Sequence, residues 1–299
     1  MRWVRDYKPQ QEASRLYRLA LWITVGGNVF LAVLKGVAAY LSGSVALYSD
    51  TANSISDVFY SLLMILGLWM AQRPPDISHP QGHSRFEPLV GLMVSFSMAF
   101  AGYEAGRASL ERFLAGGTVV EPGLPTIVLI VSVAIKLAMF YSISKIGSLL
   151  FSPTLKTTAK DNFSDVLTSS AAFIGAFGSS LIHPLLDPVA GFAVSLWIFR
   201  AAFMAAKENL YFLTGGGADE ELRHKIVETA RSVPGVLRVH RLMTDYSGPR
   251  LLVDLHLNVN ADTPLRTTHK IENEVIHRLE ALPEIDRAYV HIEPDDMPD

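Results

Sequence analysis

Carboxylates at helical spacing within apolar segments are the residues of this sequence best placed to do chemistry. Asp57 follows Asn53 by four residues, and Asp165 follows Asp161 by the same interval. Residues four apart lie on one face of a helix, so each pair stacks its oxygen atoms on one side. Ionisable groups within membrane spans are costly and usually mark a substrate path. If the two helices touch, these side chains predict an oxygen-lined site for a divalent cation, whose charge would offset the carboxylate repulsion.

A simpler interpretation of the aspartates stays open at this point. They could cap helices, face water near the membrane surface, or pair with a basic residue of another span, namely Lys35, Lys136 or Arg200. Two matched pairs on two segments favour the cation site over this alternative. Asp50 shares the helical face of the first pair. Asp50 could support the metal ligands or lie at the entry to the site, or it could equally be a structural residue that caps a helix or pairs with a lysine.

Histidines predict two further metal clusters. Asp76, His79 and His83 fall in the polar connection after the second apolar segment. A carboxylate and two imidazoles suit zinc or another transition metal, although the histidines of a hydrated loop can also be incidental. The last third of the chain contains a larger set: His240, His256, His269, His291 and Glu293. Three of these histidines, His240, His256 and His291, fall on separate predicted strands. We expect a metal site there too, against the alternative that each is an ordinary surface residue.

The elements that must position these residues are mostly apolar. Hydrophobic residues make up 49% of the 299 and charged residues only 18%, with a mean hydropathy of +0.26, whereas soluble domains average about 25% charged residues. Six segments are long enough to cross a bilayer as helices: 17–40, 45–71, 86–112, 122–146, 158–181 and 187–212. Basic residues concentrate in the N-terminal segment and the second and fourth connections, so both termini are predicted to be cytoplasmic. We therefore expect residues 1–213 to form a six-helix transmembrane domain.

Residues 214–299 have the composition of a soluble domain. Leu251, Val253, Leu255 and Leu257 alternate with polar or exposed positions, which is the period of a half-buried strand. The whole region predicts a helix, a hairpin of two strands, a second helix and a third strand: 219–233, 236–245, 251–257, 264–282 and 287–293. This αββαβ order is typical of a small ferredoxin-like domain.

Composition and motifs also exclude several classes of function. The net charge of −3 without a basic patch argues against a nucleic-acid partner, and the absence of cysteine excludes disulfides and thiolate metal sites. The sequence lacks the His-Glu-x-x-His signature of a metallohydrolase and an obvious nucleophile with its base, so we do not expect an enzyme. A channel would carry the same residues, whereas a sensor or scaffold would not need carboxylates in its spans.

Taken in order along the chain, several short stretches resemble the cation diffusion facilitator family of proton-coupled divalent metal exporters. The resemblance covers nearly the whole sequence and rests on these stretches: Ser44–Asp50, Ser56–Val58, Gly82–Glu87, Asp161–Val166, Asp187–Pro188, Pro234–Val236 and Ser247–Pro249. It implies a homodimer that exchanges metal for protons. It further implies a transport site of Asn53, Asp57, Asp161 and Asp165, a loop site of Asp76, His79 and His83, and cytoplasmic-domain sites drawn from the histidine set and Glu293.

The metal is less sharply predicted than the sites. Zinc-preferring members of the family usually carry histidine or one more aspartate where this chain has Asn53 and Asp161, so the membrane residues resemble the manganese branch. Oxygen-only ligands also favour Mn²⁺, while imidazole favours Zn²⁺. We rank Mn²⁺ modestly above Zn²⁺, because the loop and tail clusters are rich in histidine, and keep Fe²⁺ and Co²⁺ as alternatives. The compact loops favour a bacterial inner membrane over an organelle.

Overall fold

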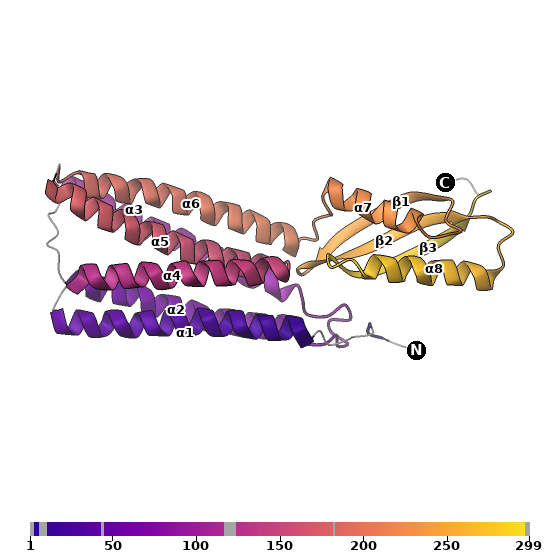
Figure 1. Cartoon of the computed structure of the whole chain (residues 1–299), viewed down its shortest axis with the longest axis horizontal. Coiled ribbons are helices and arrows are strands. Elements are labelled where there is room, and N and C mark those ends of the chain that lie inside the picture. Colours follow the sequence, from indigo (N-terminus) through magenta and orange to yellow (C-terminus); the bar gives the residue numbers. More distant parts are fainter. Residues whose placement is uncertain (1–2, 6–10, 43–44, 117–123, 182, 297–299) are drawn as a thin grey trace. The chain divides into compact units, whose positions relative to one another are not determined.

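The computed structural model describes residues 3–5, 11–42, 45–116, 124–181 and 183–296. The chain divides into two compact units, Met1–Leu210 and Tyr211–Asp299. The first unit is a bundle of long helices that run alongside one another (Figure 1): α1 (Gln11–Ser42), α2 (Val45–Ala71), α3 (Phe86–Leu114), α4 (Leu124–Leu149), α5 (Pro153–Leu181) and α6 (Leu186–Leu213). Parts of the three short connections expected between these helices, namely residues 43–44, 117–123 and 182, lie outside the described residues.

Five of these helices, within the described residues, are long and apolar enough to cross a membrane, and α5 is the exception. It has 29 residues and is therefore long enough, but its N-terminal half is polar. It also begins at Pro153 rather than at 158 as expected. The Ser152 hydroxyl accepts a hydrogen bond from the Leu155 N–H at 3.0 Å, and proline suits the first helical position. The apolar pattern could not show this start because Thr154, Lys156 and Thr157 occupy the first turns.

Small residues hold α3 close to α6. The Ser195 hydroxyl of α6 donates to the Gly102 carbonyl of α3 at 2.8 Å, and a methyl group at Gly106 would lie only 2.6 Å from the same hydroxyl. One end of this contact contains Asn209, whose amide donates to Thr157 of α5 at 2.7 Å. Packing through glycine and serine with interhelical hydrogen bonds is typical of membrane helices. Three of the helices are thereby fixed to one another.

We expect Gly91→Ala to destabilise the bundle. A β-carbon at Gly91 would lie 1.9 Å from the Asn209 side-chain oxygen, and two hydrogen bonds hold that amide in place. Overpacking of this kind costs about 1–3 kcal/mol. Gly26→Ala on α1 is the matched control, because its β-carbon would meet nothing within 4 Å. Thermal unfolding in detergent should show a lower midpoint for the first variant alone, and equal midpoints would contradict the packing described.

The second unit has the predicted αββαβ order (Figure 1): α7 (Glu220–Arg231), β1 (Arg238–Ser247), β2 (Arg250–Val259), α8 (Leu265–Glu280) and β3 (Ile285–Pro294). The central strand β2 pairs antiparallel with β1 and parallel with β3. The four residues whose alternation predicted β2 are fully buried, and Val253, Leu255 and Leu257 share one core cluster with residues of α7 and α8. The ferredoxin-like prediction is confirmed, and the polar face of the sheet is left for His256 and its neighbours.

Candidate metal centres

Three of the predicted membrane ligands lie around one buried ammonium group. Asp57 of α2 and Asp165 of α5 both pair with Lys136 of α4, whose Nζ is 3.0 Å from Asp57 Oδ2 and 2.6 Å from Asp165 Oδ2. Asp161, one helical turn before Asp165, lies on the same side of α5. One predicted pair thus contributes Asp57 and the other contributes Asp161 and Asp165, so carboxylates of both pairs lie near Lys136. Pairing with Lys136, the simpler interpretation, is present as well.

Asp57 and Asp161 also line a small cavity inside the bundle. Its volume is about 20 Å³, and its other walls are polar or apolar side chains of α1, α2, α3 and α5: Thr24, Asn28, Tyr60, Ser61, Met64, Val94, Ser97, Thr158 and Asn162. A cavity of this size with several polar walls can hold a water molecule or a single ion. Two carboxylates, two side-chain amides and five hydroxyls line the cavity, so it has the oxygen donors that a hard divalent cation requires.

The other two polar residues of α2 lie apart from this cavity. Asn53 is exposed and is not among the described residues that line it. Asp50 pairs with Lys35 of α1 at 2.9 Å, so the simpler interpretation holds for this aspartate. The structure therefore gathers Asp57, Asp161 and Asp165 and leaves Asn53 one turn away on the same helix.

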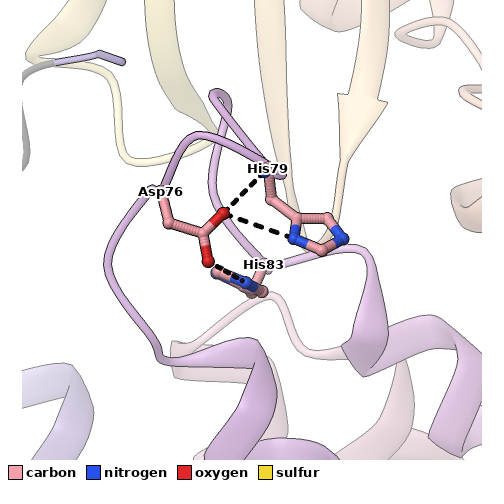
Figure 2. A group of neighbouring side chains, drawn as sticks. All are labelled: Asp76, His79 and His83. Carbon is pink, nitrogen blue, oxygen red and sulfur yellow. Dashed lines mark hydrogen bonds and ion pairs between the residues drawn. The ribbon is translucent and has the colours of Figure 1, made fainter. Parts of the chain in front are cut away.

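The loop between α2 and α3 brings together all three of its predicted ligands. Figure 2 shows the Asp76 carboxylate between His79 and His83, with Oδ1 at 3.5 Å from His79 Nδ1 and Oδ2 at 3.4 Å from His83 Nε2. The three ligand atoms lie within 4.8 Å of one another. An ion bound at about 2.1 Å from each could bridge them after small side-chain rotations.

Backbone contacts fix this loop and prepare its ligands. The His79 N–H donates to Asp76 at 2.7 Å, and this bond is the main reason that the pKa of Asp76 lies below its usual range; the two histidines add to the effect. The carboxylate is therefore ionised at neutral pH. The Pro74 carbonyl lies 3.1 Å from His83 Nδ1 and can accept a hydrogen bond from an N–H at that nitrogen; in this tautomer Nε2 carries no proton and can bind a metal. Gly82 makes the turn with a φ of 95°, a conformation that glycine adopts without strain.

In the second unit, Glu293 of β3 is the centre of the histidine cluster. Its carboxylate lies 3.2 Å from His256 Nδ1, 3.6 Å from His240 Nε2 and 3.5 Å from His291 Nε2. His256, His240 and Glu293 place their ligand atoms within 4.8 Å of one another. Asp254, which the sequence prediction did not include, adds a carboxylate oxygen 3.7 Å from His256. The polar face of the sheet thus has a mixed imidazole and carboxylate donor set, which suits zinc and related metals.

A β-bulge explains how His240 reaches this face. Val239 pairs with Leu257 and Arg241 with His256, so His240 is the extra residue between them. Val239 and Leu242 both pack on the core although they are three residues apart, which regular alternation does not allow. Bulges commonly re-aim a side chain next to a functional site. His240 is held by Asn258, whose side-chain oxygen is 2.9 Å from its Nδ1.

His269 does not join the other histidines. It lies on α8, which covers the opposite, apolar face of the sheet, and its ring contacts Glu272 and Asn273 of the same helix. The sequence placed His269 in the predicted helix 264–282, but it did not show that this helix covers the face of the sheet opposite the other histidines.

We expect Glu293→Gln to remove metal binding from the sheet while His269→Ala leaves it intact. The substitution keeps the size of the side chain but removes the charge that three histidines share. Loss of even an outer-shell partner typically lowers metal affinity by about 10–100-fold, so loss of a ligand should cost at least as much. Zinc content of the purified full-length protein, measured by elemental analysis after dialysis at low zinc, provides the comparison. Because the loop cluster can also hold zinc, we expect a lower zinc content in Glu293→Gln and not its complete loss; a lower content in both variants, or in neither, would contradict the cluster described.

Helices of membrane-spanning length around partly buried carboxylates, joined to a small ferredoxin-like domain with a candidate metal cluster, define an integral membrane protein. The family model for the cation efflux transmembrane domain matches residues 21–214, and that for the cation efflux protein cytoplasmic domain matches residues 218–295. The chain belongs to the cation efflux family, also called the cation diffusion facilitators. It is therefore a divalent metal cation transporter and not an enzyme.

Curated relatives match over most of their length. An uncharacterized transporter of Methanocaldococcus jannaschii is 34% identical over 91% of this chain and 96% of its own. The manganese efflux system protein MneS of Bacillus subtilis is 29% identical over 91% of this chain and 93% of its own. The magnetosome protein MamM of Paramagnetospirillum magneticum is 28% identical over 84% of this chain and 79% of its own.

Proposed function

We propose that this protein exports a divalent metal ion in exchange for protons, with Asp57, Asp161 and Asp165 as the core of the transport site. The observation that carries the proposal is the gathering of these three carboxylates from two helices beside a polar cavity within the apolar bundle. Carboxylates in such a place are costly and persist where a substrate needs them. Asn53, one turn before Asp57, remains the proposed fourth ligand, because the two residues share a face of α2.

Proton exchange follows from the chemistry of these ligands. A carboxylate binds a dication only when it is ionised, so protons and metal compete for the same oxygen atoms. Metal taken up from the cytoplasmic side would be released where protons are more available, and the protonated site would return. Metal affinity should therefore fall as the pH falls.

The ligand types favour Mn²⁺ modestly over Zn²⁺. Every proposed membrane ligand is an oxygen donor. Sites made only of oxygen donors suit Mn²⁺, whereas Zn²⁺ prefers sites that include imidazole. The similarity to MneS, named for manganese efflux, supports the same choice. An exporter of zinc, cadmium or iron is the alternative within the family, and the histidine-rich clusters outside the spans favour it.

We further propose that the protein is a homodimer in the cell membrane, with both termini in the cytoplasm. The C-terminal unit matches the cytoplasmic domain of cation efflux proteins, a domain through which such transporters dimerise, and this match supports the dimer. Metal bound at the loop cluster or at the Glu293 cluster would then regulate transport by tightening the two copies. Asp76, His79 and His83 would hold a metal in the loop, and His240, His256, His291 and Glu293 would hold one on the sheet.

Metal uptake into proteoliposomes under an imposed pH gradient tests the transport proposal. We expect Mn²⁺ uptake to be faster when the proton gradient drives protons out of the liposomes, and to slow strongly when a protonophore removes the gradient. Zn²⁺ uptake should be slower at equal concentration. Metal flux that does not depend on the proton gradient would identify an uncoupled channel. Zinc transport without manganese transport would overturn the assignment of the metal but not that of the carboxylate ligands.

A further inference from the structure

Lys136 places an ammonium group among the oxygen atoms of the transport site. Its Nζ lies 3.0 Å from Asn28 Oδ1, 3.0 Å from Asp57 Oδ2 and 2.6 Å from Asp165 Oδ2. An ammonium has three N–H donors, and here three oxygen atoms from α1, α2 and α5 surround it. The residue is 5% exposed and lies near the middle of α4. Oxygens of three helices thus hold this cation in the way they would hold a metal ion.

The neighbours of Lys136 hold it in this position. The Asn28 amide donates to the Ser61 hydroxyl at 2.8 Å, which turns its carbonyl oxygen toward Lys136. Ser61 in turn donates to the Asp57 carbonyl at 2.7 Å. A charge buried within a span is costly unless several partners compensate it. This network supplies such partners, and its members line the same cavity as Asp57 and Asp161.

A metal ion and this ammonium would need the same oxygen atoms. Asp57 both lines the cavity and pairs with Lys136, so a dication bound by Asp57 and Asp165 would lie close to a positive charge. The four-carbon stem of lysine is flexible enough to withdraw the ammonium while the helices stay in place. Competition between the two cations follows directly from this shared geometry.

We propose that Lys136 is a tethered counter-ion of the transport site. Its ammonium neutralises Asp57 and Asp165 in the unloaded transporter, an arriving divalent ion displaces it, and it takes the site back when the ion leaves. This inference rests on the proposed function, because it requires Asp57 and Asp165 to be metal ligands. The charge of Lys136 lowers the affinity for metal and thereby speeds its release.

Lys35 provides a matched control within the same bundle. It is buried to nearly the same degree, 6% against 5%, and it pairs with a single aspartate, Asp50, at 2.9 Å. Neither residue of that pair is among the described residues that line the cavity. Removing the charge of Lys35 therefore tests the general cost of losing a buried lysine, without the competition proposed for Lys136.

The experiment measures initial Mn²⁺ and Zn²⁺ uptake, each metal alone, by the full-length protein in proteoliposomes at fixed pH. For Lys136→Met and Lys136→Gln we expect the KM to fall by about tenfold or more, because a positive charge a few ångströms away no longer opposes the metal. The maximal rate should fall as well, because release slows. Lys136→Arg keeps the charge and should stay near wild type in KM, and Lys35→Met should leave KM unchanged.

Each other result overturns the inference. An unchanged or higher KM in both uncharged variants would show that the lysine does not compete with metal. A Lys136→Gln variant like wild type would show that hydrogen bonding alone matters, and this variant also answers the question if Lys136→Met fails to fold. Asp161→Asn separates the two proposals. Transport retained in Asp161→Asn would refute the site itself, whereas its loss, together with unchanged Lys136 variants, would refute only the counter-ion.

Discussion

Replacing Asp161 by alanine should reduce metal transport by about 100-fold or more, while the protein still folds. Asp161 lines the cavity beside Asp57, and its loss removes one of three carboxylates from the proposed ligand set. Loss of even an outer-shell partner typically costs about 10–100-fold in metal affinity, so loss of a ligand should cost at least as much. Initial rates of Mn²⁺ uptake into proteoliposomes, normalised to the protein incorporated, measure the effect.

The matched control for this change is Glu111→Gln. Glu111 is an exposed carboxylate of α3 that pairs with Arg107, and it lies on the same unit without lining the cavity. It should transport like wild type. Thermal unfolding of both variants in detergent separates loss of a ligand from loss of fold. Transport by Asp161→Ala at more than a few per cent of the wild-type rate would sink the assignment of this aspartate.

Replacing Asp161 by histidine should shift the preference of the transporter toward Zn²⁺. An imidazole nitrogen in place of a carboxylate oxygen suits Zn²⁺ better than Mn²⁺. We expect the ratio of zinc to manganese uptake to rise by about tenfold, which corresponds to about 1.4 kcal/mol of changed discrimination. Parallel uptake of the two metals at equal concentration measures this ratio directly.

Asp161→Asn is the control that separates a gain for zinc from a loss for manganese. It removes the charge without adding imidazole, so it should weaken both metals and leave their ratio near the wild-type value. If the histidine variant transports neither metal, or keeps the wild-type ratio, the ligand type at this position does not set selectivity. The selectivity would then have to come from a part of the path outside these carboxylates.

The sequence was sufficient to predict the fold because hydrophobic burial and period decide it. Apolar stretches of membrane length predicted the helices, and the alternation of Leu251, Val253, Leu255 and Leu257 predicted the central strand, whose inward residues are fully buried. The start of α5 was missed because a serine cap and polar first turns carry no apolar signal. Position within a helix follows from capping and packing, which composition does not record.

The candidate sites could be predicted in part, for a related reason. Spacing of four placed Asp161 and Asp165 on one face, but it could not show that Asp57 faces the cavity while Asn53, on the same helix, is exposed. It offered Lys136 only as one of three possible partners, because which helices meet depends on tertiary packing. His269 was grouped with strand histidines, although its helix covers the other face of the sheet.

The bulge in β1 makes one ligand of the proposed metal site on the sheet depend on a single inserted residue. Loss of the one extra residue, His240, would restore regular pairing with β2 and leave Val239 and Leu242 in the core. The fold would survive, but the sheet would have one imidazole fewer around Glu293. Under the regulation proposed above, a single codon would separate a cytoplasmic domain that responds to metal from one that only dimerises. Relatives without the bulge would be expected to transport the same ion under different control.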